Sequence, residues 1–325
     1  MPGEKIVSIQ YLRGLAALGV VCFHFANDVS PVFTFGRAGV DVFFLISGFI
    51  IVFSLLKSGY KPAMFFSFLL KRSARIDPPY YAAILLTFAL FKVMSYVPGY
   101  RGSPIPFIPG QFFAHIFYYL PFTGYDYYLF VFWTLCVEFQ FYILVGTLYF
   151  LSKNRYYKIA FLVIFSLSSL APFSIAQDVI FMQAPIFSLG MALVDFYRER
   201  NRYNLILPAF LLALIAFKFG IPIFILLLVS SAAIFYLNQN IRPLAFLGNI
   251  SYSLYLTHTL TFLVFIGTAK HFHVNLAHFP FLWLAVQIVV AVFAAYIFYL
   301  LVEKPAIRLS KRIFYKKPKE VAAQE

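Results

Sequence analysis

The feature that most constrains this chain is a series of apolar runs, each about 20 residues long, separated by short polar segments. An α-helix of that length crosses the roughly 30 Å hydrocarbon core of a bilayer. Of the 325 residues, 62% are hydrophobic and 12% are charged, whereas ordinary soluble domains carry about 25% charged residues. The sequence therefore predicts an all-α, polytopic integral membrane protein.

Ten transmembrane spans are predicted from these runs. They cover about residues 6–26, 38–56, 78–96, 128–150, 158–174, 179–196, 203–219, 221–237, 246–268 and 280–302. Prolines make the ends of the fifth to eighth spans ambiguous. Pro78-Pro79 is expected to stop any helix that precedes it, and residues 111–120 could form a short helix in the membrane interface.

The basic residues predict how the chain is oriented. Twenty of the 26 Lys and Arg residues flank the spans on one side, and five flank them on the other. Because basic residues concentrate in cytoplasmic loops, both termini are predicted to be cytoplasmic, as an even number of spans requires. This bias also explains the net charge of +14 without a nucleic-acid partner. We expect one membrane domain, residues 1–310, and a short basic cytoplasmic tail, residues 311–325.

Two ionisable side chains, Arg13 and His24, lie within the first apolar run. They are eleven residues apart, so on a helix they share nearly one face about 16 Å apart. Ionisable groups inside a membrane helix are costly and usually functional, and imidazole suits proton transfer at neutral pH. His24 could instead be an interfacial histidine with one hydrogen bond. Its orienting carboxylate could be Asp28 or Asp41, although Asp41 could equally be stabilised by a helix dipole.

Two further motifs carry charged residues. Arg72 and Arg75 share a helical face, and paired guanidinium groups suit phosphate oxygens, although both could be ordinary cytoplasmic-side charges. Glu138 lies in the fourth span, on the same side as Thr134 and Tyr142. An intramembrane carboxylate is a candidate site residue, and a structural ion pair with Arg13 is the alternative.

The ninth span carries a polar stripe. Ser251, Tyr255 and His258 are spaced at i, i+4 and i+7, and such a stripe faces protein or water, not lipid. Taken alone, His258 could be a packed, hydrogen-bonded histidine. No metal site is predicted, because the other histidines of this region are loosely spaced in an outer loop: His271, His273 and His278.

Together these motifs resemble those of the acyltransferase family 3 membrane proteins. The matching stretches are Arg13 to Ala17 with Phe23-His24-Phe25, Gly39 to Phe49, Arg72 and Arg75 before Ile76-Asp77-Pro78, Trp133 to Tyr142, Gly248 to His258, and Glu303-Lys304-Pro305. Each motif is weak alone, but six in this order over residues 11–305 are specific. Thr134, Cys136 and Thr257 depart from the family's usual residues without disturbing the charged positions.

The resemblance implies a ten-helix O-acyltransferase of the bacterial cytoplasmic membrane. Such proteins transfer an acyl group, usually acetyl, from cytoplasmic acyl-CoA to a hydroxyl group. The acceptors are sugars of exopolysaccharide, O-antigen or peptidoglycan, lipid-linked glycans, or small molecules. Acyl-CoA is thus the expected co-substrate, with no metal and no nucleic-acid partner.

We assign hypothetical roles on this basis. His24 acts as general base or transient acyl carrier and Asp41 orients it, while Arg72 and Arg75 hold the CoA phosphates. The remaining candidates line or brace the pocket: Arg13, Glu138, Ser251, Tyr255 and His258. The main alternative is a transporter or flippase whose buried charges form a substrate site or proton relay, although the sequence has no internal repeat.

Overall fold

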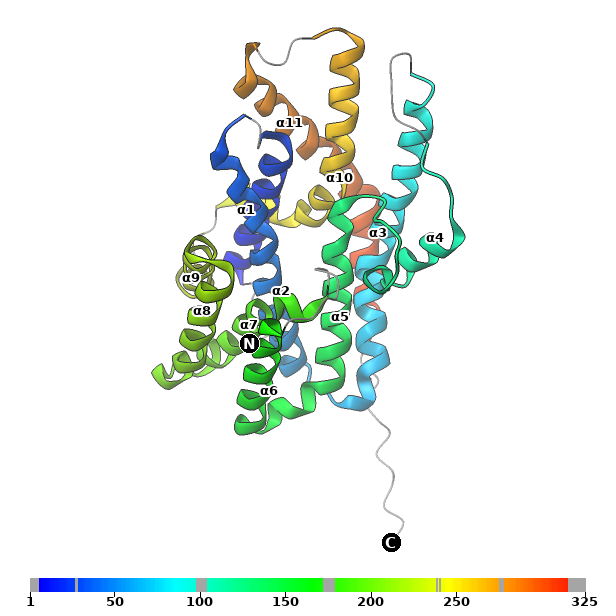
Figure 1. The fold of residues 1–325 in the computed structure, drawn as a ribbon. Helices are drawn as coiled ribbons and strands as arrows, with labels where there is room; N and C mark the ends of the chain where they lie inside the picture. Colours follow the sequence, from blue (N-terminus) through cyan, green and yellow to red (C-terminus); the bar gives the residue numbers. More distant parts are fainter. Residues whose placement is uncertain are drawn as a thin grey trace.

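The computed structural model describes residues 6–26, 29–97, 104–171, 179–237, 239, 241–274 and 278–314. Within these ranges the chain forms helices and no strand, arranged as a bundle (Figure 1). Eight helical segments of the described residues are long and apolar enough to cross a membrane, and Ile221–Tyr236 is a shorter apolar helix. The predicted all-α, multi-pass membrane architecture is therefore confirmed.

Each predicted span overlaps one of the described helices. These are α1 (Val7–Ala26), α2 (Gly39–Lys57), α3 (Phe65–Met94), α5 (Trp133–Leu148), α6 (Arg155–Leu167), α7 (Ala184–Glu199), α8 (Ile206–Phe219), α9 (Ile221–Tyr236), α10 (Arg242–His271) and α11 (Pro280–Phe298). Two shorter helices are α4 (Pro109–Ile116) and α12 (Lys304–Lys311). A π-helical turn, η10 (Tyr299–Glu303), joins α11 to α12.

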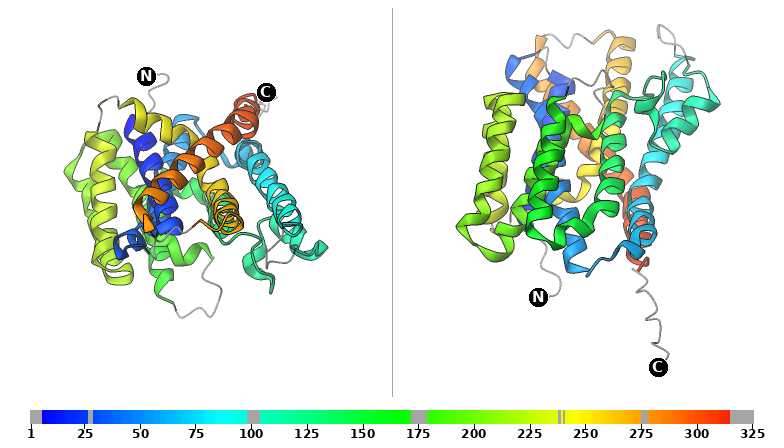
Figure 2. Two further views of the ribbon diagram at one scale, coloured as in Figure 1. Left: turned by 90° about the horizontal axis from the view of Figure 1, so that it is seen from above. Right: turned by 60° about the horizontal axis from the view of Figure 1, so that its bottom comes forward.

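Short 3₁₀ turns precede, follow or join several helices. They are η1 (Pro31–Ala38), η2 (Pro62–Met64), η3 (Leu120–Phe122), η4 (Phe130–Phe132), η5 (Tyr149–Lys153), η6 (Ser168–Leu170), η7 (Ile180–Gln183) and η8 (Arg202–Leu205). In both views of Figure 2, α8 and α9 lie at one side of the bundle and α3 lies at the opposite side.

The prediction that Pro78-Pro79 stops the preceding helix is wrong. Helix α3 has 30 residues and contains both prolines. A proline removes a backbone donor, but neighbouring helices can satisfy the freed groups inside a membrane protein. The carbonyl oxygens that lose their intrahelical donors are those of Ala74 and Arg75, four residues before each proline, and the Tyr252 hydroxyl of α10 donates to the adjacent Ile76 carbonyl at 2.9 Å. Arg72 and Arg75 therefore belong to the same long helix as the third span, and not to a separate cytoplasmic segment.

Helices α1 and α10 lie side by side and run in the same direction. A Cβ added to Gly14 would fall 2.8 Å from the backbone nitrogen of Gly248. Further along, the His24 and His258 ring centroids are 5.1 Å apart. Small residues let membrane helices approach closely in this way. The polar side chains of the first and ninth predicted spans are thereby brought together.

Helix α2 packs against α7 through a second close contact. A Cβ added to Gly48 or Gly190 would collide with backbone atoms of the other helix, and Phe44 lies 4.9 Å from Phe187 between ring centroids. With α7 covering one side of α2, another side faces α3 and α5. The space between these helices and α1 and α10 holds the candidate site.

Candidate active site

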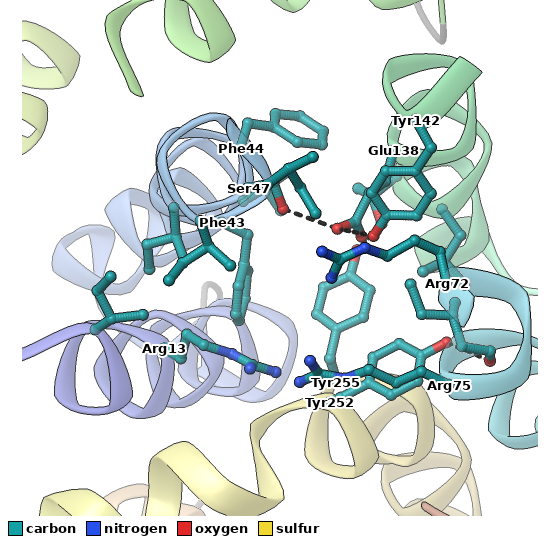
Figure 3. A pocket seen from close by; sticks show the side chains of 18 of the residues that line it. Arg13, Phe43, Phe44, Ser47, Arg72, Arg75, Glu138, Tyr142, Tyr252 and Tyr255 are labelled. Atoms are coloured by element: carbon teal, nitrogen blue, oxygen red, sulfur yellow. Dashed lines mark hydrogen bonds between the residues drawn. The ribbon is translucent and has the colours of Figure 1, made fainter. Parts of the chain in front are cut away.

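A cavity of about 240 Å³ lies between α1, α2, α3, α5 and α10 (Figure 3). Three arginines and two glutamates line this cavity. Five side chains with hydroxyl groups also line it: Ser47, Thr134, Tyr142, Tyr252 and Tyr255. Its apolar wall includes Val40, Phe43, Phe44, Ile46 and Leu135. Among the described residues, no group of three or more His, Cys, Asp or Glu side chains could hold a metal ion.

Arginine side chains from two helices converge in this cavity. Arg13 from α1 and Arg75 from α3 point their guanidinium groups toward each other, and Arg72 reaches into the same space (Figure 3). Arg75 is close enough for its charge to oppose that of Arg13. Neither Arg13 nor Arg75 forms an ion pair within 4.0 Å among the described residues. Converging like charges in a partly desolvated space favour an anionic ligand.

Glu138 is held by hydroxyl groups. Its Oε1 accepts hydrogen bonds from Ser47 Oγ at 2.8 Å and from the Tyr142 hydroxyl at 2.6 Å. Thr134, Glu138 and Tyr142 all line the cavity, which confirms that they share one side of their helix. No ion pair joins Glu138 to Arg13 in the part of the chain that the structure describes.

Glu303 supplies the second carboxylate. It is buried in the π-helical turn, and its Oε2 accepts hydrogen bonds from the backbone nitrogen and the hydroxyl of Ser253. Sequence reasoning used Glu303 only as part of a closing motif and assigned it no role. The available signal was its position as a carboxylate at the end of a long apolar run, the same rule that singled out Glu138.

Tyr255 forms the wall between the cavity and the two histidines. Its hydroxyl lies 2.9 Å from Thr134 Oγ1 and 3.0 Å from the Val131 carbonyl oxygen, which accepts. Phe43 packs edge-on against the Tyr255 ring at 5.8 Å. Behind this wall, the His258 ring lies 5.9 Å from Tyr255 and 5.1 Å from His24.

The hydrogen bonds of His258 fix where its proton resides. Nδ1 lies 2.8 Å from the Tyr255 carbonyl oxygen and 3.1 Å from that of Leu254. Carbonyl oxygens only accept, so Nδ1 carries hydrogen and Nε2 of the neutral ring has a free lone pair. Nε2 is buried and has no partner among the described residues. An unsatisfied buried acceptor beside His24 is a feature that needs a chemical explanation.

The structure brings together some of the predicted site residues and not others. Arg13, Arg72, Arg75, Glu138 and Tyr255 line the cavity. His24 and His258 contact each other outside its lining.

Two further candidates do not line the cavity. Ser251 donates instead to the Gly248 carbonyl oxygen at 2.9 Å. Asp41 lies in the first turn of α2 with Arg37 as its charged neighbour, and no hydrogen bond joins it to His24. Asp28 lies outside the described residues.

The short helix predicted over residues 111–120 corresponds to α4, but the sequence did not indicate how the segment between α3 and α5 is held. His115 of α4 is fully buried, with Nδ1 2.9 Å from the Tyr80 hydroxyl, and its Nε2 accepts from the Tyr128 backbone nitrogen at 3.2 Å. Burial lowers the pKa of His115 to about 4, against a smaller opposing effect of the Asp126 backbone. The Tyr118 hydroxyl donates to Asp77 Oδ1 at 2.8 Å. These contacts fix the segment to α3, on the helix that carries Arg72 and Arg75.

Residues 6–300 match a family model described as "Acyltransferase domain". No curated protein and no solved structure matches the chain. The match includes every residue that lines the cavity except Glu303, which follows it by three positions.

Proposed function

The chain belongs to the acyltransferase family whose model covers residues 6–300, and we propose that it is an acyl-CoA-dependent O-acyltransferase of the bacterial cytoplasmic membrane, with both termini in the cytoplasm. The donor is acyl-CoA, acetyl-CoA in the usual case. The acceptor is a hydroxyl group of a cell-envelope glycan such as exopolysaccharide or O-antigen, free or lipid-linked. The observation that carries this proposal is the convergence of arginines in a cavity. One wall of this cavity, at Tyr255, adjoins the pair His24 and His258.

The arginines support a phosphorylated donor. Arg13 and Arg75 face each other, and neither is within 4.0 Å of a described carboxylate, although Glu138 and Glu303 lie in the same cavity. Guanidinium groups bind phosphate oxygens through paired hydrogen bonds. Coenzyme A supplies such phosphates at one end and an uncharged pantetheine arm at the other. The apolar wall around Phe43, Phe44 and Ile46 suits that arm, so the thioester would point toward Tyr255.

His24 is the residue proposed to move the proton. As the acceptor oxygen attacks the thioester carbonyl, the hydroxyl proton passes to an imidazole nitrogen of His24. The C–S bond then breaks and the CoA thiolate takes up the proton, so the products are the ester and free CoA. In a second route, His24 first carries the acyl group and the acceptor hydroxyl attacks that intermediate.

His258 is suited to orient His24. Its buried Nε2 lone pair has no described partner, and a small rotation of either ring would let a His24 N–H group donate to it across the 5.1 Å ring separation. Asp41 remains a candidate for the same role. Because Tyr255 stands between the cavity and His24, transfer requires the Tyr255 side chain to move aside.

The test uses the purified protein in lipid nanodiscs with radiolabelled acetyl-CoA and candidate glycans. Wild-type protein should label the glycan, and His24→Ala should lower the rate by about 10²–10⁴-fold, the typical contribution of general acid–base catalysis. CoA binding should be unchanged. His271→Ala, at an exposed histidine near the end of α10, serves as the matched control and should keep full activity.

The transporter alternative predicts a different result. Proteoliposomes would then take up a glycan precursor, while the wild-type protein would transfer no acyl group to any acceptor. That pair of results would overturn the enzyme proposal. Transfer at the wild-type rate by His24→Ala would remove His24 from its role and leave the reaction class intact.

A further inference from the structure

A second concavity lies on the surface of the segment between α4 and α5. It encloses about 350 Å³ and is lined by Pro121, Thr123, Tyr125, Asp126, Tyr127 and Phe130. Part of the lining is open to the surroundings, since 71% of the Phe130 side chain and 42% of Tyr125 are exposed. We refer to it as the outer depression.

The chemistry of the outer depression suits a sugar. Exposed aromatic rings offer flat apolar faces on which a pyranose ring can stack, and a carboxylate accepts hydrogen bonds from sugar hydroxyl groups. The exposed Asp126 also argues that this surface meets water, because a charged group facing hydrocarbon is costly. None of the described lining residues is basic, so a neutral sugar is favoured over an acidic one.

The outer depression is held in shape by its own hydrogen bonds. Gln111 Nε2 donates to the Asp126 carbonyl oxygen at 2.8 Å, and the Tyr125 backbone nitrogen donates to Thr123 Oγ1 at 3.3 Å. The contacts of His115 and Tyr118 with α3 fix the same segment to the bundle. A surface fixed in advance loses little conformational entropy when it binds a ligand.

The η4 turn and the start of α5 carry lining residues of the outer depression and of the arginine-lined cavity. Phe130 lines the depression and Thr134 lines the cavity. They are four residues apart along η4 and α5, which corresponds to about 6–8 Å of helix rise. Between them, the Val131 carbonyl accepts from Tyr255, the residue that separates the cavity from His24. About one helical turn of backbone therefore separates a residue that lines the depression from one that lines the cavity.

We infer that the outer depression is the binding site for the acceptor glycan, and that it selects neutral sugar units. This inference rests on the proposed acyl transfer to a glycan. One sugar stacks on Tyr125 and Phe130 while a hydroxyl group donates to Asp126. A neighbouring sugar of the same chain then extends past η4 toward Tyr255 and His24.

Binding to an array of neutral, amino and acidic bacterial-type oligosaccharides tests this site without acyl-CoA. The wild-type protein in nanodiscs should bind neutral members, and the double variant Tyr125→Ala, Phe130→Ala should lose at least tenfold in affinity. Phe122→Ala is the matched control, since Phe122 is also exposed, at 62%, but does not line the depression. Binding of no glycan, or equal binding by wild type and double variant, would overturn the inference.

Kinetics separate this inference from the proposed function. In the double variant, KM for the glycan should rise while KM for acetyl-CoA stays unchanged. A wild-type protein that binds neutral glycans in a Tyr125-dependent way but transfers no acetyl group would contradict the proposed function alone. If the double variant transfers acetyl groups with an unchanged KM for the glycan, the depression is not the acceptor site, and the proposed acyl transfer still stands.

Discussion

The arginine-lined cavity and the outer depression differ in almost every property that decides what a site can bind. The cavity lies among five helices and gathers the side chains of Arg13, Arg72 and Arg75. The depression lies on a connecting segment, with exposed aromatic rings and the carboxylate of Asp126. Charge interactions are strongest where water is excluded, whereas stacking on a ring tolerates water at its edge.

Under the proposed function, the cavity would bind the acyl donor and the depression would bind the acceptor. An anionic donor needs converging cations, and a neutral acceptor needs flat apolar faces with few hydrogen-bonding groups. Tyr255 and Thr134 of the cavity bond to each other, and Tyr255 donates to Val131 of η4, the turn that also carries Phe130 of the depression. If the two sites are independent, changes in one site should leave ligand binding at the other site unaltered.

Among changes to ligand binding, the largest effect is expected from Arg75→Ala. Charge-assisted hydrogen bonds contribute about 1.5–3 kcal/mol each, so affinity for acetyl-CoA should fall about 10–150-fold. Calorimetry with the purified protein measures this loss, and binding of a neutral glycan should not change. Arg312→Ala is the control, because Arg312 is exposed after α12 and does not line the cavity. An equal loss of glycan binding would break the proposed separation of the two sites.

How much of the fold and of the candidate site could be predicted from the sequence depends on whether the contacts are local in the chain or join distant helices. The length of each apolar run predicted its helix, because bilayer thickness fixes that length. The spacing of Thr134, Glu138 and Tyr142 predicted that they share one side of their helix, because residues four apart in a helix lie on the same face. Arg13 was assigned to a site from its cost in a membrane, and Arg72 and Arg75 from their shared helical face. The structure places all three around one cavity.

Contacts between distant helices could not be predicted in the same way. The approach of Gly14 to Gly248 sets His24 beside His258, whereas sequence neighbourhood had suggested a carboxylate. Helix α3 continues through Pro78-Pro79, which the local preference of proline argues against. The outer depression depends on His115, whose burial follows from tertiary packing and not from any local pattern.

A change in pH should act on the outer depression through His115. The pKa of this buried imidazole is lowered to about 4, and an unfolded histidine titrates near 6.5. The folded segment therefore binds fewer protons, so its stability is complete above pH 6.5 and falls as the pH drops toward 4. The loss reaches about 2 kcal/mol at pH 5.

Proteolysis and hydrogen exchange of residues 104–132 between pH 7 and pH 4.5 measure this effect. The wild-type segment should open more often as the pH falls, and neutral-glycan affinity should fall with it. His115→Gln cannot titrate and should show a flatter pH profile in both measurements. A profile identical to that of the wild type would assign the pH effect to another group.

The smallest effect is expected at Tyr255, whose side chain separates the cavity from His24. Tyr255→Phe removes a hydroxyl that bonds the Val131 carbonyl and Thr134 while keeping the ring against Phe43. Loss of one such hydrogen bond costs about 1 kcal/mol, so the closed position of residue 255 should be weakened by about fivefold. We expect water to reach the thioester more often, and acetyl-CoA hydrolysis without acceptor to rise several-fold. Hydrolysis at the wild-type rate, measured as free thiol release, would mean that this hydroxyl does not hold the two spaces apart.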